Sequence, residues 1–173
     1  MSVILIEGCD NSGKTMLANK LACKMGYIVV HLSEPDGPDL DQIKPWTLDI
    51  LKRIENGENI IMDRITLVSE RIYGPLLRGN SVFTHLEWVN LWRRFIDLRP
   101  KIIYCRPPRK VILGSITKRK QKKGVISNCK KLIDEYDFFF YNLFYHDFKK
   151  QFFIYDYTKQ NEEEKLMGWM KYS

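Results

Sequence analysis

Short runs of apolar and often β-branched residues alternate along the chain with longer segments in which apolar residues recur every three or four positions. Five short runs are typical of buried strands, and they cover residues 3–6, 27–32, 59–62, 101–105 and 152–155. Seven longer segments have helical spacing: 15–25, 40–56, 69–77, 86–98, 109–120, 128–148 and 161–171. This alternation predicts an α/β fold, a three-layer sandwich in which a five-stranded parallel sheet is flanked by helices.

The chain has 173 residues, enough for one domain with a sizeable core, and its 45% hydrophobic residues exclude a disordered chain. No repeat, low-complexity tract or linker divides it, which predicts a single domain over residues 1–173. No apolar run approaches the ~20 residues that cross a bilayer, so we expect no contact with a membrane. The four cysteines are scattered, without C-x-x-C pairs or metal-ligand spacing, as expected for reduced thiols in the cytoplasm.

The segment between the first predicted strand and the first predicted helix matches the phosphate-binding signature G-x-x-x-x-G-K-[ST]. Its residues are Gly8, Cys9, Asp10, Asn11, Ser12, Gly13, Lys14 and Thr15. Glycines let backbone N–H groups converge on phosphate oxygens, and the dipole of the following helix favours the anion. We therefore expect all eight residues to bind ATP, with Lys14 on the outer phosphates and Thr15 as a ligand of Mg²⁺. The alternative is a chance match in an ordinary strand-to-helix turn.

Polar residues also follow the other predicted strands, where ligands bind in parallel sheets. Asp63 and Arg64 follow the third strand, where a carboxylate can hold Mg²⁺ or its water and an arginine can grip phosphate. Glu34 lies in an acidic turn after the second strand, and Arg106 and Arg109 follow the fourth. This convergence predicts one site at one edge of the sheet; a surface salt bridge is the simpler reading of Asp63 and Arg64.

The net charge of +7 is unevenly distributed. Twelve of the 28 basic residues lie between positions 99 and 131, where no acidic residue occurs. We expect this segment to face phosphate, with Arg106, Arg109 and Arg119 contacting ATP from a lid-like region around residues 106–127. The same residues suit contact with DNA phosphates, or a solvated helix end that carries cations.

Three further candidates lie downstream of Asp63. Arg71 and Arg78 are suited to an acceptor phosphate, and Tyr73 to stacking on a base. The alternative is that Tyr73 packs in the core and both arginines are solvated. The aromatic segment 136–148 is expected to be core packing rather than a binding platform.

Four segments, in chain order, resemble thymidylate kinases and their phage relatives in the nucleoside monophosphate kinase group. Residues 6–15 are similar to that family's loop E-G-x-D-x-x-G-K-[ST], with Asp10 at the acidic position. The pair Glu34-Pro35 resembles the family's R-E-P loop, although Ser33 replaces the arginine. Asp63-Arg64 resembles the D-R-[YFH] segment, although Ile65 replaces the aromatic residue. The basic segment resembles the family's mobile lid.

The resemblance implies a P-loop kinase fold and a phosphotransferase that uses Mg²⁺ and ATP. It implies catalytic roles for Lys14, Asp63, Arg64 and Asp10, metal binding by Thr15 and Asp63, and substrate binding by Glu34, Arg64, Arg71, Tyr73 and Arg78. The substrate nucleotide would be a thymidylate-like deoxynucleoside monophosphate. The location would be the cytoplasm, or the host cytoplasm if a phage encodes the chain. Formation of a homodimer stays open.

One departure from the family concerns the acceptor. The segment between Pro35 and Asp63 is short, and it contains Arg53 but no R-x-x-H element to grip a monophosphate. A second hypothesis is therefore a DNA kinase that phosphorylates 5-hydroxymethyluracil in phage DNA during thymidine hypermodification, with DNA held by the basic segment. A third hypothesis, a nucleotide-binding module without transferase chemistry, would need an effector region for which 173 residues leave little room.

Overall fold

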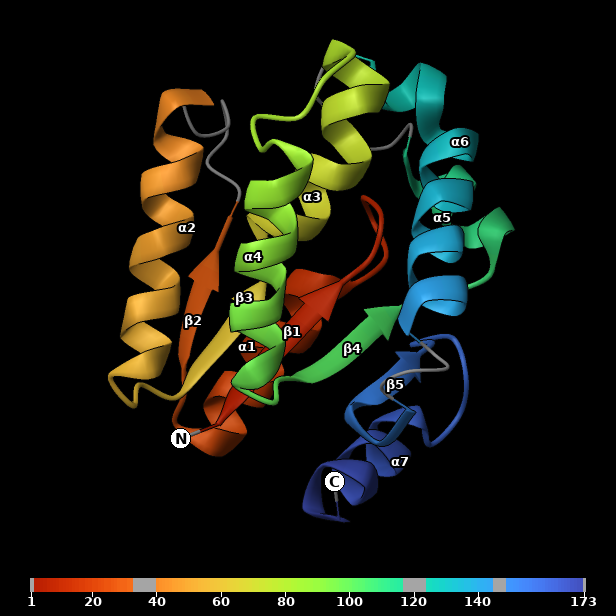
Figure 1. Ribbon diagram of the computed structural model, residues 1–173. Helices are drawn as coiled ribbons and strands as arrows, with labels where there is room; N and C mark the ends of the chain where they lie inside the picture. The colour runs from red at the N-terminus through yellow and green to blue at the C-terminus, as the bar shows by residue number, and fades with distance from the viewer. Residues whose placement is uncertain (1, 33–39, 117–123, 145–148, 173) are drawn as a thin grey trace.

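A computed structural model describes residues 2–32, 40–116, 124–144 and 149–172. Its centre is a parallel sheet of five strands in the order β2-β3-β1-β4-β5 (Figure 1). The strands are β1 Val3–Glu7, β2 Ile28–His31, β3 Ile60–Asp63, β4 Lys101–Cys105 and β5 Phe152–Tyr155. All five predicted strands are confirmed, and none of their boundaries is displaced by more than one residue.

Helices connect the strands and follow the last one. They are α1 Lys14–Met25, α2 Leu40–Glu55, α3 Thr66–Tyr73, α4 His85–Asp97, α5 Arg109–Ile116, α6 Val125–Asp137 and α7 Glu162–Tyr172. Two π-helical segments, Gly74–Arg78 and Phe138–Phe144, continue α3 and α6, and a short 3₁₀ turn, Lys149–Gln151, precedes β5.

The two faces of the sheet bury alternate residues of each strand. Val3 and Leu5 pack into a core with α2, α3, α4 and α6, whereas Ile4 and Ile6 pack on the opposite face with α1 and α7. Figure 1 shows α2 and α4 in front of the sheet and α1 behind it. Because both faces are covered, the strands read as continuous apolar runs, and the predicted three-layer sandwich is confirmed.

Two helices begin three residues before their predicted starts, whereas the other helices begin within one residue of theirs. Helix α3 begins at Thr66 rather than at residue 69, because the carbonyl of Ile65 already accepts the N–H groups of Val68 and Ser69. Its α-helical part ends beside Pro75, which has no N–H to donate. Helix α6 begins at Val125 and becomes π-helical at Phe138. The predicted helical residues 117–120 and 145–148 lie outside the described part of the chain.

The aromatic segment at the end of α6 is mainly core, as predicted. Tyr136, Phe139 and Phe140 are buried, and the Phe140 ring contacts the rings of Phe139, Tyr136 and Tyr104 of β4. Phe138 and Tyr141 are exposed, with 59% and 39% of their surfaces accessible. Within the described ranges, no helix is both long and apolar enough to cross a membrane.

Candidate phosphate-binding site

The register of the sheet brings the ends of β1, β2 and β3 together. Ile6 is paired with Asp63, and Asp63 is paired with His31 on its other side. The loop that follows β1 therefore begins beside Asp63, and the predicted convergence at the carboxyl edge of the sheet is present for these strands. Glu34, predicted at the same edge, lies outside the described residues.

Two glycines of the loop occupy positions that a larger residue would not fit. Gly8 has φ 148°, and a Cβ there would lie 2.5 Å from the carbonyl oxygen of Cys105. Gly13 has φ 90°, and a Cβ there would lie 2.8 Å from a ring carbon of Tyr157. These close approaches keep the loop compact against β4 and the segment after β5. The side-chain amide nitrogen of Asn11 is a buried donor without a partner among the described residues.

Lys14 folds back over this loop. Its Nζ donates to the carbonyl oxygen of Cys9 at 2.7 Å and to Ser12 Oγ at 3.5 Å, and the residue is 6% exposed. Burial lowers the pKa of Lys14, and the nearby Arg64 cation lowers it further. Both acceptors are neutral, so these two bonds do not pair the buried cation with a carboxylate. An incoming anion could therefore bind this cation by replacing neutral acceptors.

Thr15 and Asp63 meet across the start of α1. Thr15 Oγ1 donates to Asp63 Oδ2 at 2.5 Å, and His31 Nδ1 lies 3.0 Å from the same oxygen. Asp63 is 4% exposed, and its other oxygen, Oδ1, is buried with no hydrogen-bond partner in the described ranges. A bare carboxylate oxygen beside a threonine hydroxyl fits a magnesium ion, which takes oxygen ligands.

The described residues would not complete a magnesium shell by themselves. Among the described residues no group of three or more His, Cys, Asp or Glu side chains could hold a metal. Magnesium characteristically keeps several waters and binds through one or two protein oxygens together with substrate phosphates. The pair Thr15 and Asp63 therefore fits magnesium that arrives with a nucleotide better than a protein-enclosed metal.

Asp10, Arg64 and Tyr73 form a second cluster on the loop. Arg64 Nη2 donates to Asp10 Oδ1 at 2.7 Å, and the Tyr73 hydroxyl donates to Asp10 Oδ2 at 2.8 Å. The Arg64 guanidinium lies 5.1 Å from the centre of the Tyr73 ring. Arg64 has φ 77°, a backbone conformation that residues with a side chain rarely adopt. Three residues that were predicted from separate motifs are thus brought into direct contact.

Glu7 is a further member of the site, and sequence reasoning gave it no role. It is fully buried and accepts from the N–H of Ile65 at 2.8 Å, the N–H of Gly8 at 3.3 Å and the Tyr136 hydroxyl at 3.3 Å. Burial raises the pKa of Glu7 to about 7, and Arg64 opposes that rise. Glu7 thereby ties the phosphate loop, the turn after Asp63 and α6 together. The sequence feature that could have indicated this role is a single carboxylate at the end of an otherwise apolar strand.

Arg71 and Arg78 bind other parts of the protein. The Arg71 guanidinium lies 5.4 Å from the Trp88 ring centre, on the exposed side of α3. Arg78 Nη2 donates to Glu70 Oε2 at 2.5 Å, and the same carboxylate oxygen accepts the N–H of Val82. Arg78 therefore helps to hold the segment after α3 in place.

The two arginines after β4 pair with carboxylates of α6. Arg106 donates to both oxygens of Asp137 at 2.6 and 2.7 Å, and Asp137 also accepts from the Tyr104 hydroxyl. Arg109 pairs with Asp134 and donates to the carbonyl of Lys130. Arg119, the third predicted lid arginine, lies outside the described residues.

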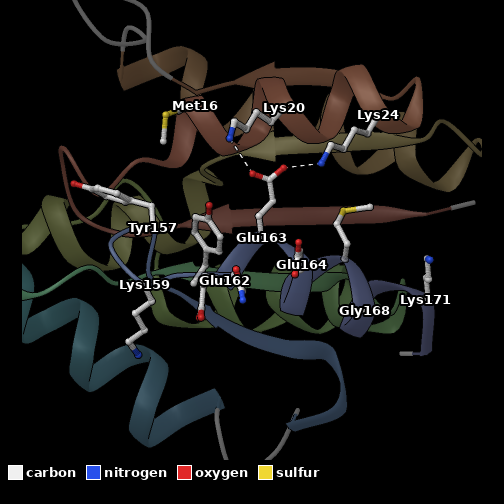
Figure 2. A pocket seen from close by; sticks show the side chains of 13 residues that line it. Met16, Lys20, Lys24, Tyr157, Lys159, Glu162, Glu163, Glu164, Gly168 and Lys171 are labelled. Atoms are coloured by element: carbon white, nitrogen blue, oxygen red, sulfur yellow. Dashed lines mark hydrogen bonds and ion pairs between the residues drawn. The ribbon is translucent and has the colours of Figure 1, made fainter.

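A groove of about 700 Å³ runs between α1, α7 and the segment after β5. Met16, directly after Thr15, lies at one side of it, and Tyr157, whose ring contacts the Gly13 position, lies at another. Figure 2 shows Glu163 between Lys20 and Lys24, which it bonds at 2.9 and 2.6 Å. Met16 and Tyr157 place this groove next to the loop that precedes α1.

Comparison with solved structures identifies proteins of similar fold. The YorR protein of Bacillus subtilis, solved in complex with phosphorylated GDP, has a TM-score of 0.71 and 16% identity, covering 98% of this chain and 96% of its own. Deoxyadenosine kinase of M. mycoides with bound dATP has a TM-score of 0.64 and 20% identity, covering 99% of this chain and 100% of its own. A gluconokinase of Sinorhizobium meliloti has a TM-score of 0.58 and 14% identity, covering 98% and 92%.

At these identities the similarity establishes a shared fold. No protein-family model matches the sequence, and a search of curated proteins finds no match. The α/β fold with its five-stranded parallel sheet is therefore similar to that of a solved deoxyadenosine kinase and a solved gluconokinase.

Proposed function

We propose that this chain is a phosphotransferase that uses magnesium and ATP and acts on a thymidylate-like deoxynucleotide. The observation that carries the proposal is the arrangement at the ends of β1 and β3. A glycine-constrained loop with a buried lysine lies beside a threonine and a carboxylate, and one oxygen of that carboxylate has no partner among the described residues. Proteins of the same fold include kinases, one of them solved with dATP.

On the donor side, the loop amides and Lys14 would hold the outer phosphates of ATP. Thr15 and Asp63 would hold the magnesium ion, which neutralises charge on the phosphates. The groove beside Met16 and Tyr157 would take the nucleoside part of the donor, and its volume of about 700 Å³ supports this assignment. To contact ATP, Arg106 and Arg109 would each have to exchange a carboxylate of α6 for phosphate. Arg119 is proposed as a lid residue from its place in the sequence.

On the acceptor side, Arg64 donates to Asp10 of the loop, and this contact orients its guanidinium. We propose that Arg64 stabilises the transferring phosphoryl group and that Asp10 positions the acceptor. Tyr73 would position Asp10 through its hydroxyl. Arg71, exposed and supported by Trp88, is the candidate for an acceptor phosphate, together with Glu34 and, less directly, Arg78, which is bonded to Glu70.

The test is a transfer assay with γ-labelled ATP, magnesium and a panel of acceptors. The panel contains the deoxynucleoside monophosphates and, because a deoxyadenosine kinase shares the fold, the free deoxynucleosides. We expect label on dTMP or a related monophosphate well above ATP hydrolysis in its absence. Transfer to the nucleosides alone would make the acceptor a free deoxynucleoside rather than a monophosphate. If no acceptor of the panel were labelled, the proposal would be wrong.

A second candidate, a kinase for 5-hydroxymethyluracil in DNA, is favoured by one observation: twelve basic residues and no acidic residue between positions 99 and 131. Two of the twelve, Arg106 and Arg109, are neutralised by Asp137 and Asp134, which lie just beyond that range. This candidate predicts label on hydroxymethyluracil oligonucleotides but not on thymine DNA, and DNA binding that weakens steeply with salt.

A further inference from the structure

His31 is the residue of β2 whose side chain contacts the candidate metal site. It is the last residue of β2, and strand pairing places it directly beside Asp63. The N–H of Leu32 donates to the backbone carbonyl of Asp63 at 3.3 Å, which extends this pairing past the end of β2. Residues that are paired in adjacent strands project to the same side of a sheet. The strand register therefore fixes the imidazole next to the carboxylate.

The hydrogen bond between them has a defined direction. Asp63 Oδ2 already accepts from the Thr15 hydroxyl, and it lies 3.0 Å from His31 Nδ1. An ionised carboxylate only accepts, so Nδ1 carries the proton and donates. Asp63 Oδ2 thus has two donors, one from α1 and one from β2, whereas Oδ1 has none among the described residues.

We infer that His31 is a positioning residue for the divalent cation: it fixes the Asp63 carboxylate through Oδ2 and reserves Oδ1 for the metal or its water. This inference rests on the proposed function, since it takes the cation to be the one that accompanies ATP. His31 is not itself a ligand, because its Nδ1 is engaged with Asp63 and magnesium takes oxygen. A single donor, Thr15, would leave the carboxylate able to turn about its last bond and exchange its two oxygens.

Side-chain length offers a sharp test of this geometry. In asparagine the amide nitrogen is as many bonds from Cα as His31 Nδ1, whereas the glutamine amide nitrogen lies one bond further, as Nε2 does. We therefore expect His31→Asn to keep the contact with Asp63, and we expect His31→Gln and His31→Ala to lose it. His85, an exposed residue at the start of α4, provides the matched control His85→Ala.

The measured quantity is the gain in ATPγS affinity that magnesium provides, the ratio of the dissociation constants in EDTA and in Mg²⁺ by titration calorimetry. Loss of a group that orients a metal ligand costs 10–100-fold in metal affinity. We expect His31→Ala and His31→Gln to reduce the ratio by about tenfold or more. His31→Asn and His85→Ala should stay within about threefold of wild type, and affinity in EDTA and the melting temperature should hardly change.

Two outcomes would overturn the inference: an unchanged ratio in His31→Ala, or rescue by His31→Gln in place of His31→Asn. Neither outcome touches the proposed function, which depends on transfer of phosphate. If ATPγS did not bind to wild type at all, the proposed function would fail, and the same variants would be compared for binding of Mn²⁺ alone by electron paramagnetic resonance. Equal Mn²⁺ binding by wild type and His31→Ala would then exclude the role of His31.

Discussion

The phosphate loop and the start of α5 both present cations at the carboxyl edge of the sheet, but the two regions differ in what those cations bind. Lys14 donates to a carbonyl and a hydroxyl, both neutral, and beside it Asp63 has an oxygen without a partner in the described ranges. At α5, Arg106 and Arg109 each meet a carboxylate of α6. At the phosphate loop, the hydrogen bonds of Lys14 therefore go to neutral acceptors. At the start of α5, each arginine is neutralised by a carboxylate of the protein itself.

This difference indicates where a phosphate would bind at low cost. At Lys14 the anion replaces neutral acceptors, and charge-assisted hydrogen bonds are roughly twice as strong as neutral ones. At Arg106 the anion must displace Asp137, which holds the guanidinium with two bonds and is itself bonded to Tyr104. A count of positive residues cannot distinguish these cases, because it ignores the partner that each cation already has.

The largest expected effect is the loss of phosphate transfer in Lys14→Ala. Removing one preorganised charge contact to the reacting group commonly lowers a rate by ~10²–10³. The transfer assay measures this effect, with Lys52→Ala, an exposed lysine of α2, as the control. A variant that turned over as fast as wild type would place the reacting phosphates elsewhere and would remove the contrast between the two regions.

A second prediction concerns Glu7, beneath the loop. Its pKa is raised from 4.5 to about 7, so between these values the unfolded chain loses a proton that the folded chain keeps. The free energy of unfolding should therefore fall as pH rises from 4.5 to 7, by up to about 3 kcal/mol from this group. Below pH 4.5 the contribution is complete, and above pH 7 it is lost.

Glu7→Gln removes this titration. Urea unfolding at several pH values measures the free energy of unfolding of both proteins. The variant should be less stable by a constant amount, because its hydrogen bonds to Gly8 and Ile65 are changed. Relative to wild type, its free energy of unfolding should increase as pH rises. Glu135→Gln, at an exposed position of α6, should run parallel to wild type. If the Glu7→Gln curve also ran parallel, the buried carboxylate would not be the source of the pH dependence.

The central strands and the position of the glycine loop between β1 and α1 could be predicted because their signals are local. A contiguous motif specifies Gly8, Lys14 and Thr15, and parallel pairing then brings Asp63 to them. The ion pairs of Arg106 and Arg109 could not be predicted, because Asp137 and Asp134 are 31 and 25 residues away along the chain. These carboxylates reach the arginines only through the packing of α6. His31 escaped notice for the same reason: its partner lies on another strand, and only the register shows the pairing.

The third prediction concerns Arg106→Ala, which tests whether Arg106 stabilises the fold rather than binding ATP. The change leaves Asp137 without its bidentate partner, and hydrogen bonds between charged groups contribute about 1.5–3 kcal/mol. For a chain of this size the melting temperature should fall by roughly 3–12 °C. The dissociation constant for ATP should rise far less than in Lys14→Ala. A large loss of ATP affinity at unchanged stability would instead show that Arg106 exchanges Asp137 for phosphate.

The smallest effect is expected for Arg109→Ala. Arg109 and Asp134 are both exposed, with 39% and 59% of their side chains accessible, and such pairs contribute at most about 1 kcal/mol. Added salt should shrink the difference in unfolding free energy between this variant and wild type, because exposed charges are screened. Asp134→Ala provides the matched test: if the pair is only a surface contact, the coupling between the two single changes in the double variant should not exceed about 1 kcal/mol. A larger coupling would show that the pair contributes more than a surface contact. A loss of ATP binding in Arg109→Ala would mean that the start of α5 and the phosphate loop act together.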